Sequence, residues 1–307
     1  MPALLTHHFF GLDILAKTKE YPEASEPAYE AFMLGCQGPD PLFYTALTFQ
    51  AGACWRAGSF LHQQRVAQAI DAFILAAHAQ PDNHLKVLDA YLRGWIAHFS
   101  LDSLAHPLII SQEQAITSAG ILGLGQEGRS EVHSQIEADL DSMMLMRRYG
   151  LTIRDYKPTD SVLVISSEPL DWISTMYRQV VEAVLDIRLT DQSFRTCVQG
   201  MRLCYRALYS PSGIKRSIFG HIERIFRAHS MAQAASHCAG IGLECDFDNH
   251  EHALWINPFT GEESHSSFLD IYGQAVTACV ERLGGLSLGA SGFDITNGLN
   301  FNGKICD

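Results

Sequence analysis

Ionisable side chains recur at four-residue steps in one segment of the sequence that is otherwise strongly apolar. His98, Asp102 and His106 follow one another at this interval, and Trp95 and Tyr91 lie one and two turns earlier. At about 100° per residue, all five side chains fall on the same side of a helix, and the aromatic members indicate that this side faces inward. Inward-facing ionisable groups are costly unless they are paired or bind a metal. The column therefore predicts a set of metal ligands.

A second pair of the same kind lies in the segment from residue 130 to 144. His133 and Glu137 are one helical turn apart, and Leu140 and Met144 extend the same stripe. A solvent-exposed pair at this spacing is the alternative interpretation. We favour a buried pair, because three other acidic residues are expected to form the solvated side of this helix: Glu131, Asp139 and Asp141.

Histidine and carboxylate, rather than cysteine, are the side chains available as ligands. The chain has 14 histidines, and its eight cysteines form no Cys-x-x-Cys pair, which argues against a zinc ribbon or a thioredoxin-like site. We expect reduced thiols that act as small buried hydrophobic groups. The sequence also lacks the His-Glu-x-x-His motif of zinc proteases, a repeated Glu-x-x-His motif and a His-Asp dipeptide.

The elements that must position these residues are mostly helices. Apolar residues at three- and four-residue steps predict helices over 59–79, 84–105, 130–149, 168–187, 191–209, 212–229 and 267–283. The stretch 162–166 fits either a short strand or a buried connection. Glycines and prolines predict a rigid corner over 35–41, and residues 240–266 are expected to be rich in loops.

We therefore expect an all-α, multi-helix fold that forms one domain over residues 1–307. Its core would span about 1–235, and a loop-rich C-terminal arm would span about 236–307.

Composition excludes several classes of protein. With 47% hydrophobic residues, the 307-residue chain can bury a sizeable core, which excludes a disordered or low-complexity protein. A formal net charge of −12 argues against extended nucleic-acid binding, which needs a basic surface. The N-terminus has no signal-peptide pattern, and no run approaches the ~18 apolar residues of a membrane span. We expect a cytoplasmic location.

The order of these side chains resembles the bacterial zinc-dependent phospholipases C, which are related to clostridial alpha-toxins and to single-strand-specific zinc nucleases. In that family an N-terminal His, a loop Asp and a further His precede a helix with His-x3-Asp and another His. A second helix then carries His-x3-Glu. This sequence supplies eight residues in the same order: His7, Asp40, His62, His98, Asp102, His106, His133 and Glu137. The resemblance covers the first 140 residues and implies a helical bundle of the phospholipase C type.

The resemblance also implies a trinuclear zinc site. One zinc would be held by Asp40, His62, His98 and Asp102, a neighbour by His7 and the bridging Asp102, and a third by His106, His133 and Glu137. Secreted members begin with a Trp whose amine and carbonyl bind zinc, and no Trp lies near this N-terminus. Binding of two or of three ions therefore stays open, as does the choice between His7 and His8 as a ligand.

The implied reaction is hydrolysis of a phosphodiester, in which a zinc-bound hydroxide attacks the phosphorus of a phospholipid head-group ester. Asp40, on its Pro-bounded loop, is the expected catalytic residue that orients or deprotonates the water. Two alternatives are kept: a zinc-dependent nuclease or phosphatase, and a catalytically silent, metal-stabilised helical binding module.

Aromatic residues near the ligands could receive a quaternary ammonium head group, or could belong to the core. They are Phe9, Phe10, Phe43, Tyr44, Trp55, Tyr91 and Trp95. A basic amphipathic segment over 212–227 could make a transient contact with an anionic membrane surface, or could be an ordinary solvated face.

Overall fold

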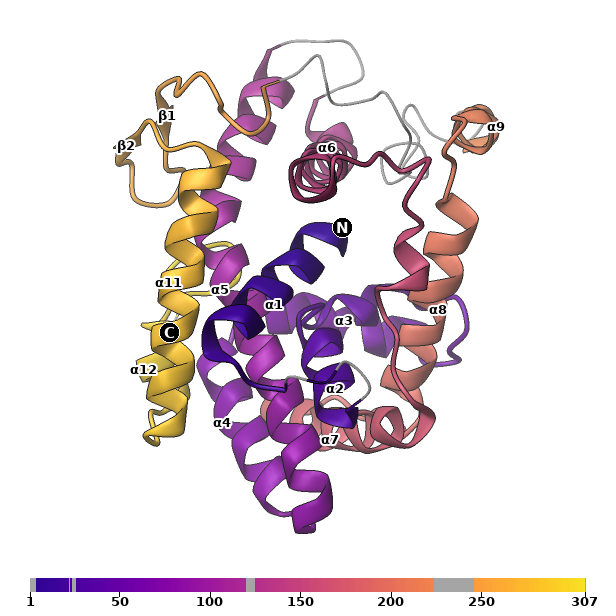
Figure 1. The fold of residues 1–307 in the computed structure, drawn as a ribbon, viewed down its shortest axis with the longest axis vertical. Helices are drawn as coiled ribbons and strands as arrows, with labels where there is room; N and C mark the ends of the chain where they lie inside the picture. Colours follow the sequence, from indigo (N-terminus) through magenta and orange to yellow (C-terminus); the bar gives the residue numbers. More distant parts are fainter. Residues whose placement is uncertain (1–3, 22, 24–25, 120–124, 224–245, 307) are drawn as a thin grey trace. The chain divides into compact units, whose positions relative to one another are not determined.

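The computed structural model describes residues 4–21, 23, 26–119, 125–223 and 246–306. Helices make up nearly all of its regular structure, which confirms the predicted all-α class (Figure 1). The chain divides into two units. Unit 1 comprises residues 1–6, 105–161 and 204–272, and unit 2 comprises residues 7–104, 162–203 and 273–307. The single-domain organisation stays a prediction.

Unit 2 is built around helices that the sequence places far apart. Its elements include α2 (Pro27–Gly35), the 3-10 turn η1 (Asp40–Phe43), α3 (Ala51–Gln63), α4 (Val66–His78), α7 (Ser167–Leu185) and α12 (Gly292–Thr296). Unit 2 also includes most of three further helices: α1 (Leu4–Thr18), α8 (Ser193–Leu208) and α11 (Phe268–Ser287). Helix α4 packs against both α7 and α12, and α3 packs against η1.

Aromatic side chains fill the centre of unit 2. The Tyr177 ring stacks on Phe194 with centroids 3.9 Å apart, and Phe73 meets Tyr177 edge-on at 5.2 Å. Tyr91 and Trp95, which the sequence placed on the inward side of their helix, are completely buried. This core fixes the inner face of the helix that carries His98.

Two helices of unit 2 cross in backbone contact. A Cβ atom on Gly35 of α2 would lie 2.2 Å from the Tyr91 carbonyl oxygen, and one on Gly94 would lie 2.1 Å from that of Phe32. Only glycine at both positions allows this approach. The crossing brings the C-terminal end of α2 to the helix that carries the first predicted ligand column.

That helix, α5 (Asp82–Ser118), is longer than predicted. The sequence indicated an end near residue 105, but the helix continues through Pro107. Proline removes one helical hydrogen bond. Apolar residues on either side of Pro107 are buried: Leu101, Leu108 and Ile109. Their packing compensates for the missing hydrogen bond. Residues up to Leu104 belong to unit 2, and those from Ala105 belong to unit 1.

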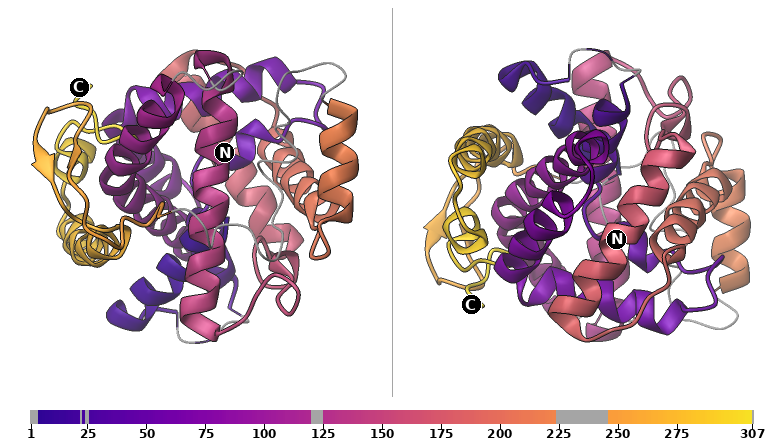
Figure 2. Two further views of the ribbon diagram at one scale, coloured as in Figure 1. Left: turned by 90° about the horizontal axis from the view of Figure 1, so that it is seen from above. Right: turned by 90° about the horizontal axis from the view of Figure 1, so that it is seen from below.

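Unit 1 contains the rest of the predicted ligands. Its elements are η2 (Gln126–Gly128), α6 (Arg129–Tyr149), η3 (Pro158–Asp160), α9 (Ile214–Glu223) and a hairpin of β1 (Trp255–Ile256) with β2 (Glu263–Ser264). The strands are antiparallel, with Trp255 opposite Ser264, and appear as orange arrows in Figure 2.

Several predicted boundaries need correction. The helix expected over 59–79 is two helices, because Arg65 adopts a left-handed conformation with φ 55° between α3 and α4. Of the two alternatives for residues 162–166, the structure shows the connection, with Val162 and Leu163 buried. Helices α1 and α2 were not predicted. The helix expected over 212–229 is seen as α9, and its predicted part beyond residue 223 lies outside the described residues.

The C-terminal arm is partly as expected. Residues 246–267 are loops and the small hairpin, and α11 confirms the helix predicted over 267–283, whereas α12 was not predicted. The arm's first residues, 236–245, lie outside the described part of the chain. Among the helices that are described, none combines the length and the apolar composition needed to cross a bilayer.

Candidate metal centre

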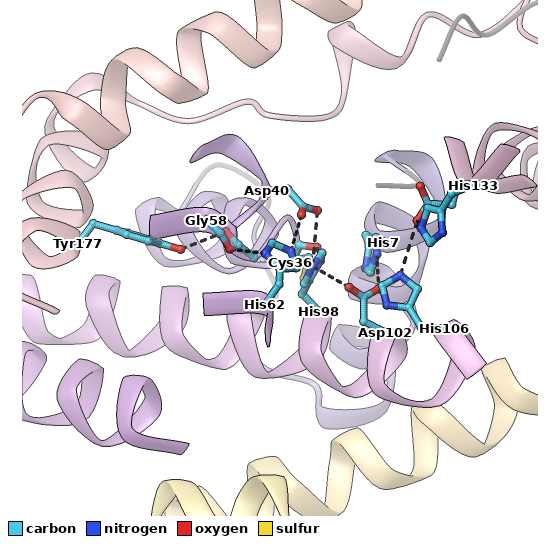
Figure 3. A network of polar contacts seen from close by, with 12 residues as sticks. His7, Cys36, Asp40, Gly58, His62, His98, Asp102, His106, His133 and Tyr177 are labelled. Atoms are coloured by element: carbon cyan, nitrogen blue, oxygen red, sulfur yellow. Dashed lines mark hydrogen bonds and ion pairs between the residues drawn. The ribbon is translucent and has the colours of Figure 1, made fainter. Parts of the chain in front are cut away.

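Asp40, His62 and His98 form one group of possible ligands in unit 2 (Figure 3). Asp40 begins η1, His62 lies in the last turn of α3, and His98 lies in α5. His62 Nε2 is 2.9 Å from Asp40 Oδ1, and His98 Nε2 is 3.5 Å from Asp40 Oδ2. The two oxygens of one buried carboxylate thus face two different imidazoles.

Asp102 links this group to a second one. Its Oδ2 lies 3.2 Å from His98 Nε2, and its Oδ1 lies 3.0 Å from His7 Nε2. The rings of His7 and His98 stack with centroids 4.0 Å apart. His7, His98 and Asp102 form the second group that could hold a metal ion. His8 is buried against Phe9 and belongs to none of the groups among the described residues, so the geometry favours His7.

Backbone carbonyls orient two of these imidazoles. The Cys36 carbonyl, at the end of α2, lies 3.1 Å from His98 Nδ1, and the Gly58 carbonyl lies 2.7 Å from His62 Nδ1. A carbonyl can only accept, so each Nδ1 carries a proton, and in the neutral imidazole each Nε2 has its lone pair toward the cluster. This is the arrangement that metal-binding histidines usually have.

The Gly-Pro-Asp corner holds Asp40 in place. Gly38 has φ +52°, and a Cβ atom there would lie 2.3 Å from Cδ2 of His98. Its carbonyl accepts hydrogen bonds from the hydroxyls of Tyr91 at 3.3 Å and Tyr177 at 3.2 Å. The rigid corner predicted from the sequence is therefore hydrogen-bonded to the aromatic core and packs directly against His98, a predicted ligand.

The donor atoms of unit 2 suit a bound cation. Within the described part of the chain, His98 Nε2 and Asp40 Oδ2 are fully buried and make no hydrogen bond. Burial lowers the pKa of His62, but its hydrogen bond to Asp40 and the charge of that carboxylate outweigh burial and raise the pKa overall. A buried carboxylate and the lone pair of a neutral imidazole are both acceptors, so they repel each other and both attract a cation. A metal ion between them would therefore satisfy both.

A third group lies in unit 1 and consists of His106, His133 and Glu137. Glu137 Oε1 is 3.2 Å from His133 Nε2 and 3.7 Å from His106 Nε2. Burial raises the pKa of Glu137, but neighbouring positive charge, including that of His133, holds it well below its usual range. Burial lowers the pKa of His133, yet the charge of Glu137 and hydrogen bonds to two carboxylates raise it to about 9.

One of those two carboxylates, Glu113 on α5, was not predicted as part of the site. Its Oε2 accepts a hydrogen bond from His133 Nδ1 at 2.9 Å, and its Oε1 accepts one from Arg129. Burial raises the pKa of Glu113, but these two partners lower it overall. The spacing could have revealed this residue, because Glu113 follows His106 by two helical turns and lies on the same face.

Asp141 was placed on the wrong side of its helix. It was expected on the solvated side of α6, but it is completely buried, and Asp139 is also buried. Asp141 follows Glu137 by four residues, so helical spacing puts it on the ligand face. Its carboxylate accepts hydrogen bonds from the amides of Leu5 at 3.0 Å and Thr6 at 2.7 Å, and from the Thr6 hydroxyl. It thereby satisfies free amides in the first turn of α1.

Most of the aromatic residues near the ligands belong to the core. Five are buried: Phe9, Phe10, Tyr44, Tyr91 and Trp95. The other two of the seven predicted aromatic residues, Phe43 and Trp55, are not buried. The ring centroid of Phe43 lies 6.2 Å from that of Trp55 and 5.1 Å from that of His62, a predicted ligand.

Cysteine does not contribute to the three groups. Six cysteines lie among the described residues and none of them is in a disulfide, as expected, while Cys238 and Cys245 lie outside that part of the chain. Every one of the eight predicted ligands falls in one of the three groups, within which the candidate ligand atoms lie within 4.8 Å of one another. Comparisons with known protein families, curated proteins and solved structures gave no match.

Proposed function

We propose that this chain is a zinc-dependent phosphodiester hydrolase of the phospholipase C type. The observation that carries the proposal is the position of Asp102, whose two oxygens face two different imidazoles, those of His7 and His98. His98 also belongs to the group of Asp40 and His62. A carboxylate shared in this way suits two metal ions held close together, as in many enzymes that hydrolyse phosphate esters. The imidazole and carboxylate donors suit zinc.

The residues of unit 2 have distinct roles in this proposal. His62 and His98, held through Nδ1, would offer Nε2 to one ion together with Asp40 and Asp102, and His7 would offer Nε2 to the neighbouring ion. Bound zinc lowers the pKa of a water molecule and offsets the charge that develops on the phosphate. Asp40 Oδ2 accepts the proton of the attacking water, since it is buried at the cluster and makes no hydrogen bond of its own among the described residues.

A phospholipid is the proposed substrate. The resemblance to phospholipases C suggests it, and Phe43 with Trp55 supports it by placing aromatic faces next to His62. Such faces attract a quaternary ammonium head group. The net charge of −12 gives no support for an extended nucleic-acid substrate.

Metal content and one substitution test the proposal. We expect at least two zinc ions per purified chain and hydrolysis of a chromogenic phosphocholine ester. In Asp40→Asn, assayed with zinc in excess so that the ions stay bound, hydrolysis should fall by roughly 10²- to 10⁴-fold, as for loss of a general base. Asp186→Asn is a matched control, because Asp186 is exposed at the end of α7 and far in sequence from the ligands.

Three results would contradict the proposal in different ways. Fewer than two zinc ions per chain would remove the paired-ion basis. Full activity of Asp40→Asn would remove the role of Asp40. Zinc binding without hydrolysis of any phosphoester would favour the silent metal-stabilised module, whereas cleavage of single-stranded nucleic acid alone would favour the nuclease.

A further inference from the structure

Large apolar side chains are exposed along the segment that joins Asp40 to His62, two candidate ligands of unit 2. Between η1 and the end of α3, Leu47 is 46%, Trp55 56% and Phe60 41% exposed, and Phe49 is fully exposed. These four residues fall within 14 positions of the sequence, and we call them the α3 apolar surface. Side chains of this size that share one exposed surface are typical of an interaction site.

The loop that carries Leu47 and Phe49 is firmly held. The Gln50 side-chain oxygen accepts hydrogen bonds from Thr190 N at 2.9 Å and Ser193 Oγ at 2.6 Å, and its amide donates to the Arg188 carbonyl at 3.3 Å. At the other end, α8 approaches so closely that a Cβ atom on Gly200 would lie 2.3 Å from the Tyr44 carbonyl oxygen. Phe49 is therefore presented to solvent by an anchored loop.

The stretch of sequence that carries this surface has a charge opposite to that of the chain as a whole. No Asp or Glu occurs from residue 41 to residue 70, and Arg56 and Arg65 give this stretch a formal charge of +2, while the whole chain carries −12. Arg56 is exposed on the same stretch of α3 as Trp55. Exposed aromatic residues flanked by arginine suit the interface of a bilayer that contains anionic lipid.

The surface is also continuous with the ligand groups. The Phe43 ring is in contact distance of both Trp55 and His62, which in turn lies 2.9 Å from Asp40. A lipid layer that covers Phe49 and Trp55 would bring phosphate groups to the edge of the candidate metal centre. No step along this path leaves unit 2.

We propose that the α3 apolar surface docks on a phospholipid bilayer containing anionic lipid, with Leu47 and Phe49 inserted among the lipids. The inference rests on the proposed function for its substrate, but the docking itself can be measured without catalysis. A second copy of the chain is a poorer occupant, because in a symmetric contact the arginines would face one another.

Helix α9 is a rival surface on the other unit. Its Ile214, Ile218 and Ile222 recur at four-residue steps and are each more than half exposed. The α3 apolar surface is favoured because it adjoins predicted ligands and is held by an anchored loop. The experiment must therefore include a variant of each surface.

Co-sedimentation of the full zinc-loaded chain with sucrose-loaded vesicles of phosphatidylcholine and phosphatidylserine tests the proposal. The double variant Leu47→Ser/Phe49→Ser should bind at least about tenfold more weakly, because two side chains no longer leave water. Leu288→Ser is the matched control, since Leu288 is 92% exposed elsewhere in unit 2, and its binding should equal that of the wild type. The emission of Trp55 should shift to the blue when wild-type chain binds vesicles.

The outcomes separate docking from catalysis. Hydrolysis of a water-soluble phosphocholine ester should be the same in the double variant and the wild type. Weaker vesicle binding by the double variant in a chain without hydrolytic activity would keep the docking surface and remove the proposed function. Unchanged binding by the double variant, loss of binding in Ile218→Ser alone, or a wild-type dimer that the double variant dissociates would each overturn the docking proposal.

Discussion

The substitution Glu113→Gln should weaken metal binding at the unit 1 group and leave the unit 2 groups intact. Glu113 accepts a hydrogen bond from His133 Nδ1 at 2.9 Å, and its side chain is only 4% exposed. Glutamine is similar in shape and keeps an acceptor oxygen, so the change mainly removes the negative charge that makes the imidazole a better donor. Loss of such outer contacts lowers metal affinity by about 10- to 100-fold, which corresponds to roughly 1.4–2.7 kcal/mol.

Competition with a chromogenic chelator measures both the number of bound ions and their affinities. For Glu113→Gln, we expect one ion per chain to become weaker by that factor while the others keep wild-type affinity. Asp139→Asn is the matched control, because it makes the same acid-to-amide change at a buried residue of α6 that bonds Gln135 at 3.0 Å. An unchanged affinity profile for Glu113→Gln would refute the argument, and an equal loss in the control would attribute the effect to general damage.

Three further predictions concern the folded state. In the metal-free chain the pKa of His133 is raised to about 9, so its protonation stabilises the fold fully below the unfolded pKa of about 6.5. That contribution, at most roughly 3 kcal/mol, should disappear as the pH rises through 9, and urea unfolding from pH 6 to 10 would detect it; a flat profile would contradict it. Asp141→Asn should lower the unfolding free energy by about 1–3 kcal/mol in the same assay, because the first turn of α1 loses a buried charged acceptor. Gly38→Ala should cost about 1–3 kcal/mol and reduce zinc content, because the new Cβ meets His98 at a positive φ, whereas Gly52→Ala enters open space and should do neither; equal effects would contradict this.

Helical periodicity explains why so much of the site could be predicted. His98 contacts Asp102 because the two lie one turn apart on α5, and the same holds for His133 and Glu137 on α6. His106 follows Asp102 by one more turn of α5. No long-range information is needed for such columns. Asp141 follows Glu137 at the same four-residue interval, so this spacing predicts a buried residue. It was instead expected on the solvent-exposed side of α6.

The rest of the site depends on contacts between distant segments, which spacing does not encode. The carbonyl of Cys36 reaches His98 only because Gly35 and Gly94 let α2 and α5 touch. Every residue has a carbonyl, so no residue type marks this one in advance. The resemblance implied that Asp40 and His62 would bind the same ion, and in the structure His62 Nε2 lies 2.9 Å from Asp40 Oδ1.

The outer contacts of the histidines show how the two units differ. In unit 2 the Nδ1 atoms of His62 and His98 are held by neutral backbone carbonyls, whereas in unit 1 the Nδ1 of His133 is held by the charged Glu113. A carboxylate partner makes an imidazole more electron-rich than a carbonyl does, so it strengthens the bond from Nε2 to a metal. Protons compete for the same lone pair, and the hydrogen bond to Glu113 contributes, after the charge of Glu137, to the raised pKa of His133. The ligand types alone would make the groups look alike, so we expect the partner behind each imidazole to distinguish their metal affinities.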